Sequence, residues 1–316
     1  MGHERHTVTV FAPVLHLTVT VESGASSADE IHIHPGGQGF WIARMLKHLD
    51  ERPLLCGPQG GETGKVLLGL LGQFGMDTST VEIAQATPAI IQDRRSGDRE
   101  PIAESPNVSL ARHEIDDIYG RFLDRALASQ VAVVTGQSHE ILPIDFYKRL
   151  GHDLASAEVR VVADLHGPEL WAFLEGGPID MLKVSDEDLE CDGLLSHADA
   201  GDDECLAALE RLHDSGAVSI VLSRQHKTAL ARDGDRLYRA TAPELDPADH
   251  RGAGDSMTAG LTVGLRRELD FDDTVRLGCA AGAANVTRHG LGSADEGLVP
   301  GLAERTKVEA IQGMRA

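Results

Sequence analysis

Apolar residues recur along the chain in two alternating patterns, one typical of buried strands and one typical of amphipathic helices. Short apolar, β-branched runs at 131–135, 159–164 and 218–222 have the length of core strands. Segments such as 144–154 and 204–213 instead repeat apolar residues every three or four positions, as in a helix that buries one face. This order predicts an α/β fold with a mostly parallel sheet covered by helices.

Two stretches of the chain, residues 14–34 and about 86–112, depart from this alternation. Both consist of short β-rich runs separated by polar turns. We find no linker, internal repeat or low-complexity tract in the sequence. We therefore expect a single domain over residues 1–316 that carries these stretches as a small appendage.

The charge of the chain excludes several kinds of partner. The formal net charge is -21, with 50 acidic residues against 29 lysines and arginines. Such a surface repels nucleic acids and anionic membranes, so we expect neither as a partner. The first 22 residues contain neither a basic leader nor a long apolar run, and the four cysteines form no closely spaced pair. We expect a cytoplasmic protein with reduced thiols.

Three candidate binding patterns carry little weight. His32 and His34 share one face of a predicted strand, but no third metal ligand lies nearby in the sequence. The run Gly57–Lys65 is not a P-loop, because Val66 follows where serine or threonine is needed. Gly36–Gly39 lacks the third glycine of a dinucleotide fingerprint, which makes an oxidoreductase a remote alternative.

The segment Gly252–Ser256, with the sequence Gly-Ala-Gly-Asp-Ser, is the strongest signal of chemistry. Apolar residues recur at helical spacing from 257 to 265, so the backbone N–H groups of 252–255 lie at the positive end of a predicted helix. Such donors stabilise an anion, and a carboxylate beside them is suited to take a proton from a hydroxyl group. The segment therefore predicts a phosphoryl-transfer site; an ordinary glycine-rich helix cap is the alternative. The catalytic candidates are Gly252, Ala253, Gly254 and Asp255.

The same segment resembles a signature of the ribokinase-like carbohydrate kinases, the phosphofructokinase B family. A second signature of that family, Gly-Gly-Lys-Gly-x-Asn-Val-Ala-Arg, resembles Gly36–Leu46, more than 200 residues earlier. The chain is most similar to the 1-phosphofructokinase and tagatose-6-phosphate kinase branch, as a divergent member. This resemblance implies a three-layer α/β/α sandwich in which 14–34 and 86–112 form a small β lid over the sugar. It also implies ATP and Mg²⁺, and it suggests the lid as the contact of a homodimer.

The resemblance also suggests where ATP binds. Lys183–Leu189 occupies the position of the family's Lys-Pro-Asn-x-x-Glu-Leu, so Ser185 and Asp188 replace an asparagine and a glutamate that organise magnesium and phosphates through water. Both replacements keep oxygen atoms, which suit a hard cation, and Asp188 is the metal candidate. The ATP-binding candidates implied by the resemblance are Lys183, Ser185, Asp188, Ser223, Arg224, Gly282 and Asn285. For Arg224 a solvent-facing side chain is the alternative, and for Gly282 and Asn285 a tightly packed helix.

The acceptor side departs from the family pattern. The resemblance places His16 where the family has an aspartate that grips sugar hydroxyls, Gln38 in place of a lysine and Trp41 in place of an asparagine. A Thr-Arg pair is replaced by Thr87-Pro88, although Arg94, Arg95 and Arg99 lie in the same segment. The identity of the acceptor therefore does not transfer from the family. The substrate-binding candidates are His16, Gly36, Gly37, Gln38 and Trp41.

Two functions from different classes follow. The first is an ATP-dependent kinase that phosphorylates a hydroxyl group of a sugar or other small metabolite, with Asp255 as general base. The second is a nucleotide- or metabolite-binding protein of the same fold with impaired catalysis, which the altered residues at 185 and 188 and on the acceptor side suggest. The complete Gly252–Asp255 unit favours the first.

Overall fold

The computed structural model describes residues 6–24, 28–97, 99–106, 108–136, 141–225, 227–243, 245, 251–287, 292–294 and 297–311. Within them, ten strands form the main sheet in the order β16-β15-β14-β13-β12-β11-β10-β1-β4-β6. The strands from β13 to β6 are parallel, while β14, β15 and β16 pair antiparallel at one end. The bounds are β1 Val8–Phe11, β4 Pro53–Cys56, β6 Asp77–Thr78, β10 Val131–Thr135, β11 Arg160–Asp164, β12 Ile179–Ser185, β13 Ala217–Ser223, β14 Ala229–Asp233, β15 Arg236–Thr241 and β16 Lys307–Ala310.

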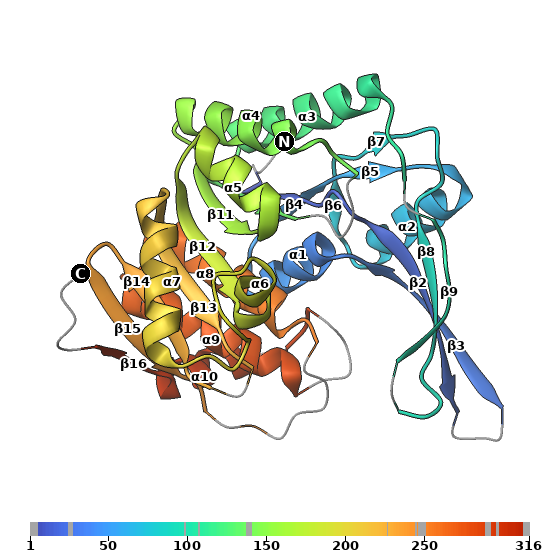
Figure 1. Cartoon of the computed structure of the whole chain (residues 1–316). Coiled ribbons are helices and arrows are strands. Elements are labelled where there is room, and N and C mark those ends of the chain that lie inside the picture. The colour runs from blue at the N-terminus through green and yellow to red at the C-terminus, as the bar shows by residue number, and fades with distance from the viewer. Residues whose placement is uncertain are drawn as a thin grey trace.

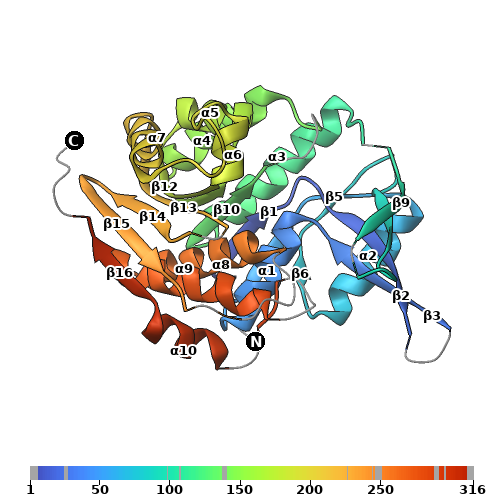
Figure 2. The same ribbon diagram turned by 60° about the horizontal axis from the view of Figure 1, so that its bottom comes forward.

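Helices cover both faces of this sheet (Figures 1 and 2). One apolar cluster joins the sheet to α3–α7, and the other joins it to α1, α2 and α8–α10. Neighbouring strand residues such as Ala132 and Val133 belong to opposite clusters, which explains the continuous apolar runs of the strands. The helices are α1 Gln38–His48, α2 Gly61–Gln73, α3 Arg112–Leu127, α4 Ile144–Ser156, α5 Gly167–Gly176, α6 Asp186–Cys191, α7 Asp202–Asp214, α8 Ala253–Arg266, α9 Phe271–Val286 and α10 Leu298–Arg305.

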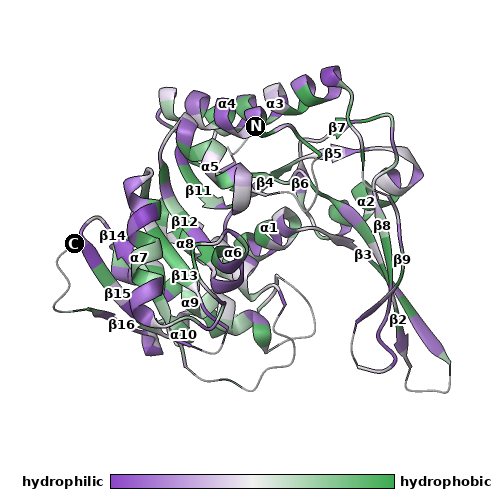
Figure 3. Ribbon diagram, viewed as in Figure 1, coloured by the Kyte–Doolittle hydropathy of each residue, from purple (hydrophilic) through white to green (hydrophobic). Residues whose placement is uncertain are grey.

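The layers agree with the three-layer α/β/α sandwich expected from the sequence. Hydropathy mapped on the ribbon shows hydrophobic strands in the middle and helices such as α3, α4 and α7 that alternate between hydrophobic and hydrophilic residues (Figure 3). This is the pattern of helices that bury one face against a sheet. None of the helices among the described residues is long and apolar enough to cross a membrane.

A second sheet of four strands projects from the body (Figure 1). Both segments that break the alternating pattern contribute to it, and its order is β3-β2-β8-β9. That it acts as a lid over the sugar stays a prediction. The bounds are β2 His16–Ser23, β3 Asp29–Gly36, β8 Ala89–Asp93 and β9 Glu100–Glu104; beside it, β5 Pro58–Gln59 pairs with β7 Val81–Glu82.

Candidate active site

The predicted site residues gather at the carboxyl edge of the parallel strands, where ligands bind in open α/β sheets. Asp164 ends β11, Ser185 ends β12 and Ser223 ends β13, and these three strands are neighbours in the sheet. Helix α8 begins beside them and contacts both β11 and β12. The fold therefore brings together residues that are up to about a hundred positions apart in the sequence.

Helix α8 begins at Gly252, whose backbone has a φ of 73°, in the left-handed region. Glycine adopts this conformation without the steric cost that other residues incur. No side chain caps this helix end, and Asp255 is the acidic residue of its first turn. The N–H groups of the first turn are therefore free of a side-chain cap at the positive end of the helix, as the sequence predicts.

A buried lysine lies directly below this turn. A Cβ atom added to Gly254 would lie 2.8 Å from Lys183 Nζ, so the ammonium group lies directly against the glycine turn. Lys183 Nζ lies 3.5 Å from Asp164 Oδ1, and Thr258 Oγ1 donates a hydrogen bond of 2.6 Å to Asp164 Oδ2. Asp164, Lys183 and Thr258 are all buried, so these charges interact with little screening by water.

This environment changes the proton affinity of Asp255. Burial, and then the negative charge of Asp164, raise the pKa of Asp255 to about 7, although the Lys183 ammonium opposes the shift. The pKa of Lys183 itself is raised, because the carboxylates of Asp164, Asp188 and Asp255 outweigh the opposite effect of burial. Lys183 is therefore a permanent positive charge at neutral pH, while Asp255 exchanges protons near neutrality.

Ser185 and Asp188 form a reciprocal cap at the start of α6. Ser185 Oγ accepts the N–H of Asp188 at 3.1 Å, and Asp188 Oδ2 accepts the N–H of Ser185 at 2.9 Å. This capping box satisfies two helix-end donors, which is a structural role that the sequence reading did not assign. The Asp188 carboxylate still acts electrostatically on Lys183, so it lies close to the site as well.

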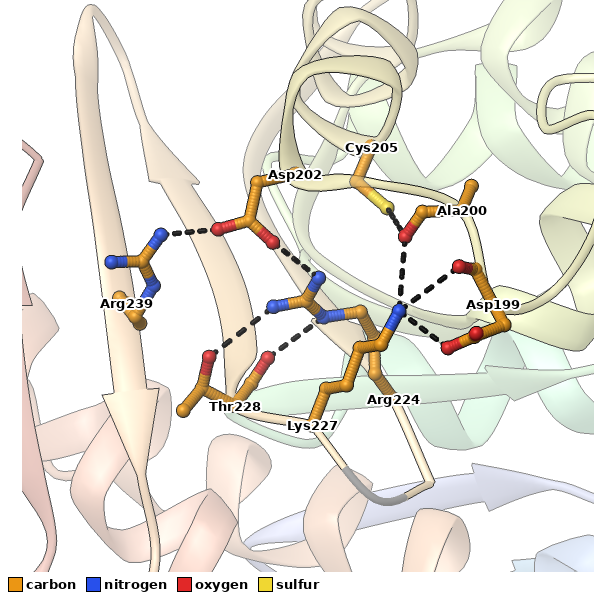
Figure 4. Close-up of polar contacts among 8 residues, drawn as sticks. All are labelled: Asp199, Ala200, Asp202, Cys205, Arg224, Lys227, Thr228 and Arg239. Carbon is orange, nitrogen blue, oxygen red and sulfur yellow. Dashed lines mark hydrogen bonds and ion pairs between the residues drawn. The ribbon is translucent and has the colours of Figure 1, made fainter.

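Arg224, which the sequence predicts to contact the nucleotide phosphates, has several polar partners within the protein (Figure 4). Its side chain is buried, and its guanidinium donates to the carbonyl oxygen and hydroxyl of Thr228 at 2.8 and 3.2 Å and to Asp202 Oδ1 at 2.6 Å. Asp202 begins α7 and also binds Arg239 of β15. Arg224 therefore ties the connection between β13 and β14 to α7, and a contact with the nucleotide phosphates stays a prediction. Ser223 stays at that edge, in register with Ser185.

Gly282 and Asn285 lie on α9 and support the start of α8. A Cβ atom on Gly282 would approach the Ala253 carbonyl oxygen to 3.0 Å, so the two helices are in close contact there. The buried Asn285 side chain donates to the Arg251 carbonyl oxygen and accepts the Gly292 N–H, both at 2.7 Å. Asn285 thus holds the segment that leads into the glycine turn.

On the acceptor side, the structure brings His16 next to the start of the segment Gly36–Leu46. His16 and Gly36 are paired in β2 and β3, and a Cβ atom on Gly36 would lie 2.2 Å from His16 Nε2. Gly37 has a φ of 113° and begins α1, with Gln38 as the first helical residue. Burial, with a smaller effect of the neighbouring His34, lowers the pKa of His16 to about 4, so this imidazole is neutral at physiological pH.

Trp41 adds an aromatic wall beside these residues. Its ring centroid lies 4.7 Å from that of Phe40 and 6.0 Å from that of His34. Within the described residues, no group of three or more histidine, cysteine, aspartate or glutamate side chains could hold a metal ion. His34 instead binds Thr20 Oγ1 at 3.1 Å, while His32 lies 3.5 Å from Glu30.

Two of the three arginines considered as phosphate ligands pair with acidic residues of the four-stranded sheet. Arg94 binds Glu22 at 3.1 Å, and Arg95 binds Asp93 at 2.6 Å and Asp29 at 3.1 Å. Arg99 lies close enough to His34 to contribute to the lowering of its pKa, for which burial is the main cause.

The sequence reading missed Asp164 and Thr258 as site residues. Asp164 ends a predicted core strand, which is where site carboxylates gather in parallel sheets, and Thr258 follows Gly254 by one helical turn. The sequence contains both of these local signals. It does not show that helix α8 packs against strand β11, which is what brings the two residues together.

The chain has extensive similarity to known sugar kinases. A family model described as pfkB family carbohydrate kinase matches residues 8–296. The 1-phosphofructokinase of Bacillus subtilis is 24% identical over 298 residues, 93% of this chain and 95% of that protein. The ATP-dependent 6-phosphofructokinase isozyme 2 of Mycobacterium tuberculosis is 29% identical over 286 residues, 88% of this chain and 80% of that protein. A structure of phosphofructokinase-2 from Escherichia coli has the same fold, with a TM-score of 0.83 at 21% identity over 95% of this chain and 99% of that one.

Proposed function

This chain belongs to the pfkB family of carbohydrate kinases, and we propose that Asp255 is the general base of its ATP-dependent phosphoryl transfer to a sugar hydroxyl group. The observation that carries the assignment is the position of the Asp255 carboxylate in the first turn of α8, beside helix-start N–H groups and close to the buried Lys183; its raised pKa agrees with this role. A base titrating near the working pH is both available and strong enough to take a proton.

In this proposal each residue has one task. Asp255 takes the proton of the acceptor hydroxyl group as its oxygen attacks the γ-phosphorus of ATP, and the bond from that phosphorus to the β–γ bridging oxygen breaks to release ADP. The N–H groups of Ala253, Gly254 and Asp255 and the Lys183 ammonium stabilise the negative charge on the transferred group. No catalytic step requires these donors to move, because the glycine turn fixes them in advance.

The donor side is proposed to lie along the ends of β12 and β13. Ser185 and Ser223 face the phosphates there, and Gly282 and Asn285 support the wall behind the nucleotide. Mg²⁺ binds proteins through one or two carboxylates together with substrate phosphates and water, which suits Asp188 acting through water near Lys183. When bound, the ion would neutralise charge on the ATP phosphates.

The acceptor is proposed to be a neutral hydroxylated molecule held by His16, Gly36, Gly37, Gln38 and Trp41. A neutral imidazole and an indole ring offer no positive charge to a sugar phosphate. Arg94 and Arg95 are engaged in ion pairs of their own in the four-stranded sheet, whereas Arg99 and Arg44 lie close enough to His34 to contribute to the lowering of its pKa, for which burial is the main cause. A binding protein without catalysis is not favoured, because the chain keeps the Gly252–Asp255 unit together with Lys183.

The Asp255→Asn variant tests the proposal. It keeps the size of the side chain but removes the base, so we expect kcat to fall ~100- to 10,000-fold while ATP binding persists. Turnover should be measured over a panel of sugars, sugar phosphates and nucleosides, with calorimetry for ATP. Asp273→Asn is the matched control, since Asp273 lies in the first turn of α9. Full turnover in Asp255→Asn would refute the assignment.

A further inference from the structure

His166 lies at the carboxyl edge of the main sheet, beside the proposed donor residues. It follows Asp164, the last residue of β11, by two positions and directly precedes α5. Its backbone is still extended, with a φ of -143° and a ψ of 176°. Because Asp164 pairs with Lys183, the same register continued by two residues brings His166 level with Ser185. Adjacent strands lie about 4.8 Å apart, so His166 and Ser185 are neighbours at this edge.

A buried carboxylate holds the imidazole ring from one side. His166 Nδ1 lies 3.6 Å from Asp192 Oδ1, and the Gly167 N–H donates to Asp192 Oδ2 at 2.8 Å. The Asp192 side chain is only 5% exposed, whereas that of His166 is 52% exposed. A carboxylate that is itself fixed in this way sets the orientation of a histidine ring through one nitrogen. The other nitrogen, Nε2, stays accessible to a ligand at the strand edge.

Helix α6 links His166 to the proposed magnesium residue. Asp192 follows Asp188 by one helical turn, so the two carboxylates lie on the same side of α6. The interaction with Asp192, partly opposed by burial, raises the pKa of His166, and the charges of Asp188 and Glu169 act in the same direction. His166 therefore carries a positive charge more readily than an ordinary histidine. Asp188 also acts electrostatically on Lys183, so two cationic side chains lie near it.

The strand order indicates which part of the nucleotide lies nearest to His166. The proposed donor residues Ser185 and Ser223 end β12 and β13, while the acceptor segment that begins at His16 follows β1. Strand β11 lies between the two sides, because the sheet order runs β13-β12-β11-β10-β1. Asp164, at the end of β11, interacts electrostatically with Asp255. The phosphoryl group that passes from donor to acceptor therefore lies beside the end of β11.

We propose that His166 binds the γ-phosphate of ATP through Nε2, and that Asp192 is a positioning residue that orients the ring. An imidazolium N–H donates a charge-assisted hydrogen bond to a phosphate oxygen. The contact holds the phosphoryl group for transfer and takes no part in the proton transfer to Asp255. This proposal rests on the function proposed above and adds to it a residue that distinguishes ATP from shorter nucleotides.

Calorimetry with ATP, ADP and AMP in the presence of Mg²⁺ tests the contact. His166→Ala should weaken ATP binding about tenfold or more and leave ADP and AMP binding unchanged, because only ATP carries the γ-phosphate. His166→Lys keeps a cation and should bind ATP more tightly than His166→Ala does. His152→Ala removes an exposed histidine of α4 and is the control. An unchanged ATP affinity in His166→Ala, or an equal loss for all three nucleotides, would overturn the proposal.

Variants of Asp192 test the positioning role. Asp192→Asn keeps an oxygen atom for the Gly167 N–H but removes the charge behind the ring. It should weaken ATP binding by a smaller factor than His166→Ala and leave AMP binding unchanged. In the His166→Ala background the same change should have no further effect, because Asp192 acts through the ring. A loss of ATP affinity of the same size with and without His166 would show that Asp192 does not act through it.

The kinase function and the γ-phosphate contact can fail separately. If the wild type phosphorylates a sugar and His166→Ala leaves ATP affinity unchanged, the kinase function holds and the contact fails. If the wild type binds ATP but phosphorylates no acceptor, the kinase function fails, and a loss in His166→Ala that is selective for ATP keeps the contact. A His166→Ala variant that raises only the KM of the acceptor would place His166 on the acceptor side and overturn the proposal.

Discussion

The protonation state of Asp255 depends on its burial and on two neighbouring charges, Asp164 and Lys183. Burial and Asp164 favour its protonated form, and Lys183 favours its ionised form. A pKa of about 7 means that the side chain is protonated below neutrality and cannot accept a proton from the substrate there. The rate of an ordinary exposed aspartate base would instead fall only near pH 4.

The pH dependence of kcat/KM follows from this shift. We expect an acidic limb with an apparent pKa near 7, below which kcat/KM falls about tenfold per pH unit. Asp164→Asn removes a negative charge that raises the pKa of Asp255, while the Lys183 ammonium, which lowers that pKa, remains. The acidic limb should therefore move to lower pH. Steady-state kinetics over pH 5 to 9 measure both enzymes, with Asp273→Asn as the control. A limb near pH 4, or one that Asp164→Asn does not move, would contradict this account.

For single residues, the sequence predicted the backbone conformation of the glycine turns better than the contacts that side chains make. Gly252 and Gly37 lie at positive φ at the starts of two helices, as glycine-rich turns before apolar repeats indicate. Arg224 could not be placed from the sequence, because its partner Asp202 begins a different helix and only the packed fold brings them together. The same holds for Thr258 and Asp164, which are separated by 94 positions.

At the scale of elements, α6 combines a structural and a proposed functional role. Its first turn is capped by Ser185 and Asp188, and the second of these is also the proposed magnesium residue. The two roles need different properties of the side chain. A cap needs an acceptor oxygen, whereas an interaction with a cation needs negative charge.

Variants of Asp188 separate these roles. Asp188→Asn keeps an oxygen for the Ser185 N–H, so the melting temperature should stay close to that of the wild type while the magnesium needed for half-maximal rate rises several-fold. Asp188→Ala should raise the magnesium requirement and also lose ~1 kcal/mol of stability with the cap. Asp188→Glu should be at least as active, because its carboxylate reaches farther. Magnesium titrations and thermal unfolding measure these effects, and an unchanged magnesium dependence in all three variants would leave Asp188 as a cap only.

The order of the elements was largely readable from the sequence, except at the antiparallel end of the main sheet. The alternation of apolar runs and amphipathic repeats predicted the parallel strands and the helices that cover them. The antiparallel strands β14 and β15 were not predicted, although Asp233-Gly234 is a hairpin signal and Gly234 has a φ of 53°. Pairing of β16 with β15 depends on a segment near the end of the chain that returns to the sheet edge, which no local pattern indicates.

At the scale of the whole molecule, the large negative charge contrasts with an apolar face on the four-stranded sheet. Ile31 and Ile33 of β3 are 66% and 50% exposed, and they lie opposite Val21 and Val19 of β2. Ile91 of β8 extends the same face, because it pairs with Val19. Exposed apolar patches of this kind mark interaction sites. The homodimer that the family resemblance suggests through these strands stays a prediction. A second copy of this chain fits the face, since an apolar surface can pair with itself without complementary charges, which a net charge of -21 makes scarce.

The double variant Ile31→Lys with Ile33→Lys tests the pairing. Two lysines on each copy would face their counterparts across a symmetric contact, so burial would cost both desolvation and repulsion. Sedimentation velocity should show a dimer for the wild type and a 33.8 kDa monomer for the variant. Val218→Lys, at a residue 47% exposed on β13, is the control and should stay dimeric. The acceptor residue His16 begins β2 of the same sheet, so loss of the dimer should also raise the KM for the acceptor more than the KM for ATP. A wild-type monomer, or a variant that remains a dimer, would show that this face does not join two copies.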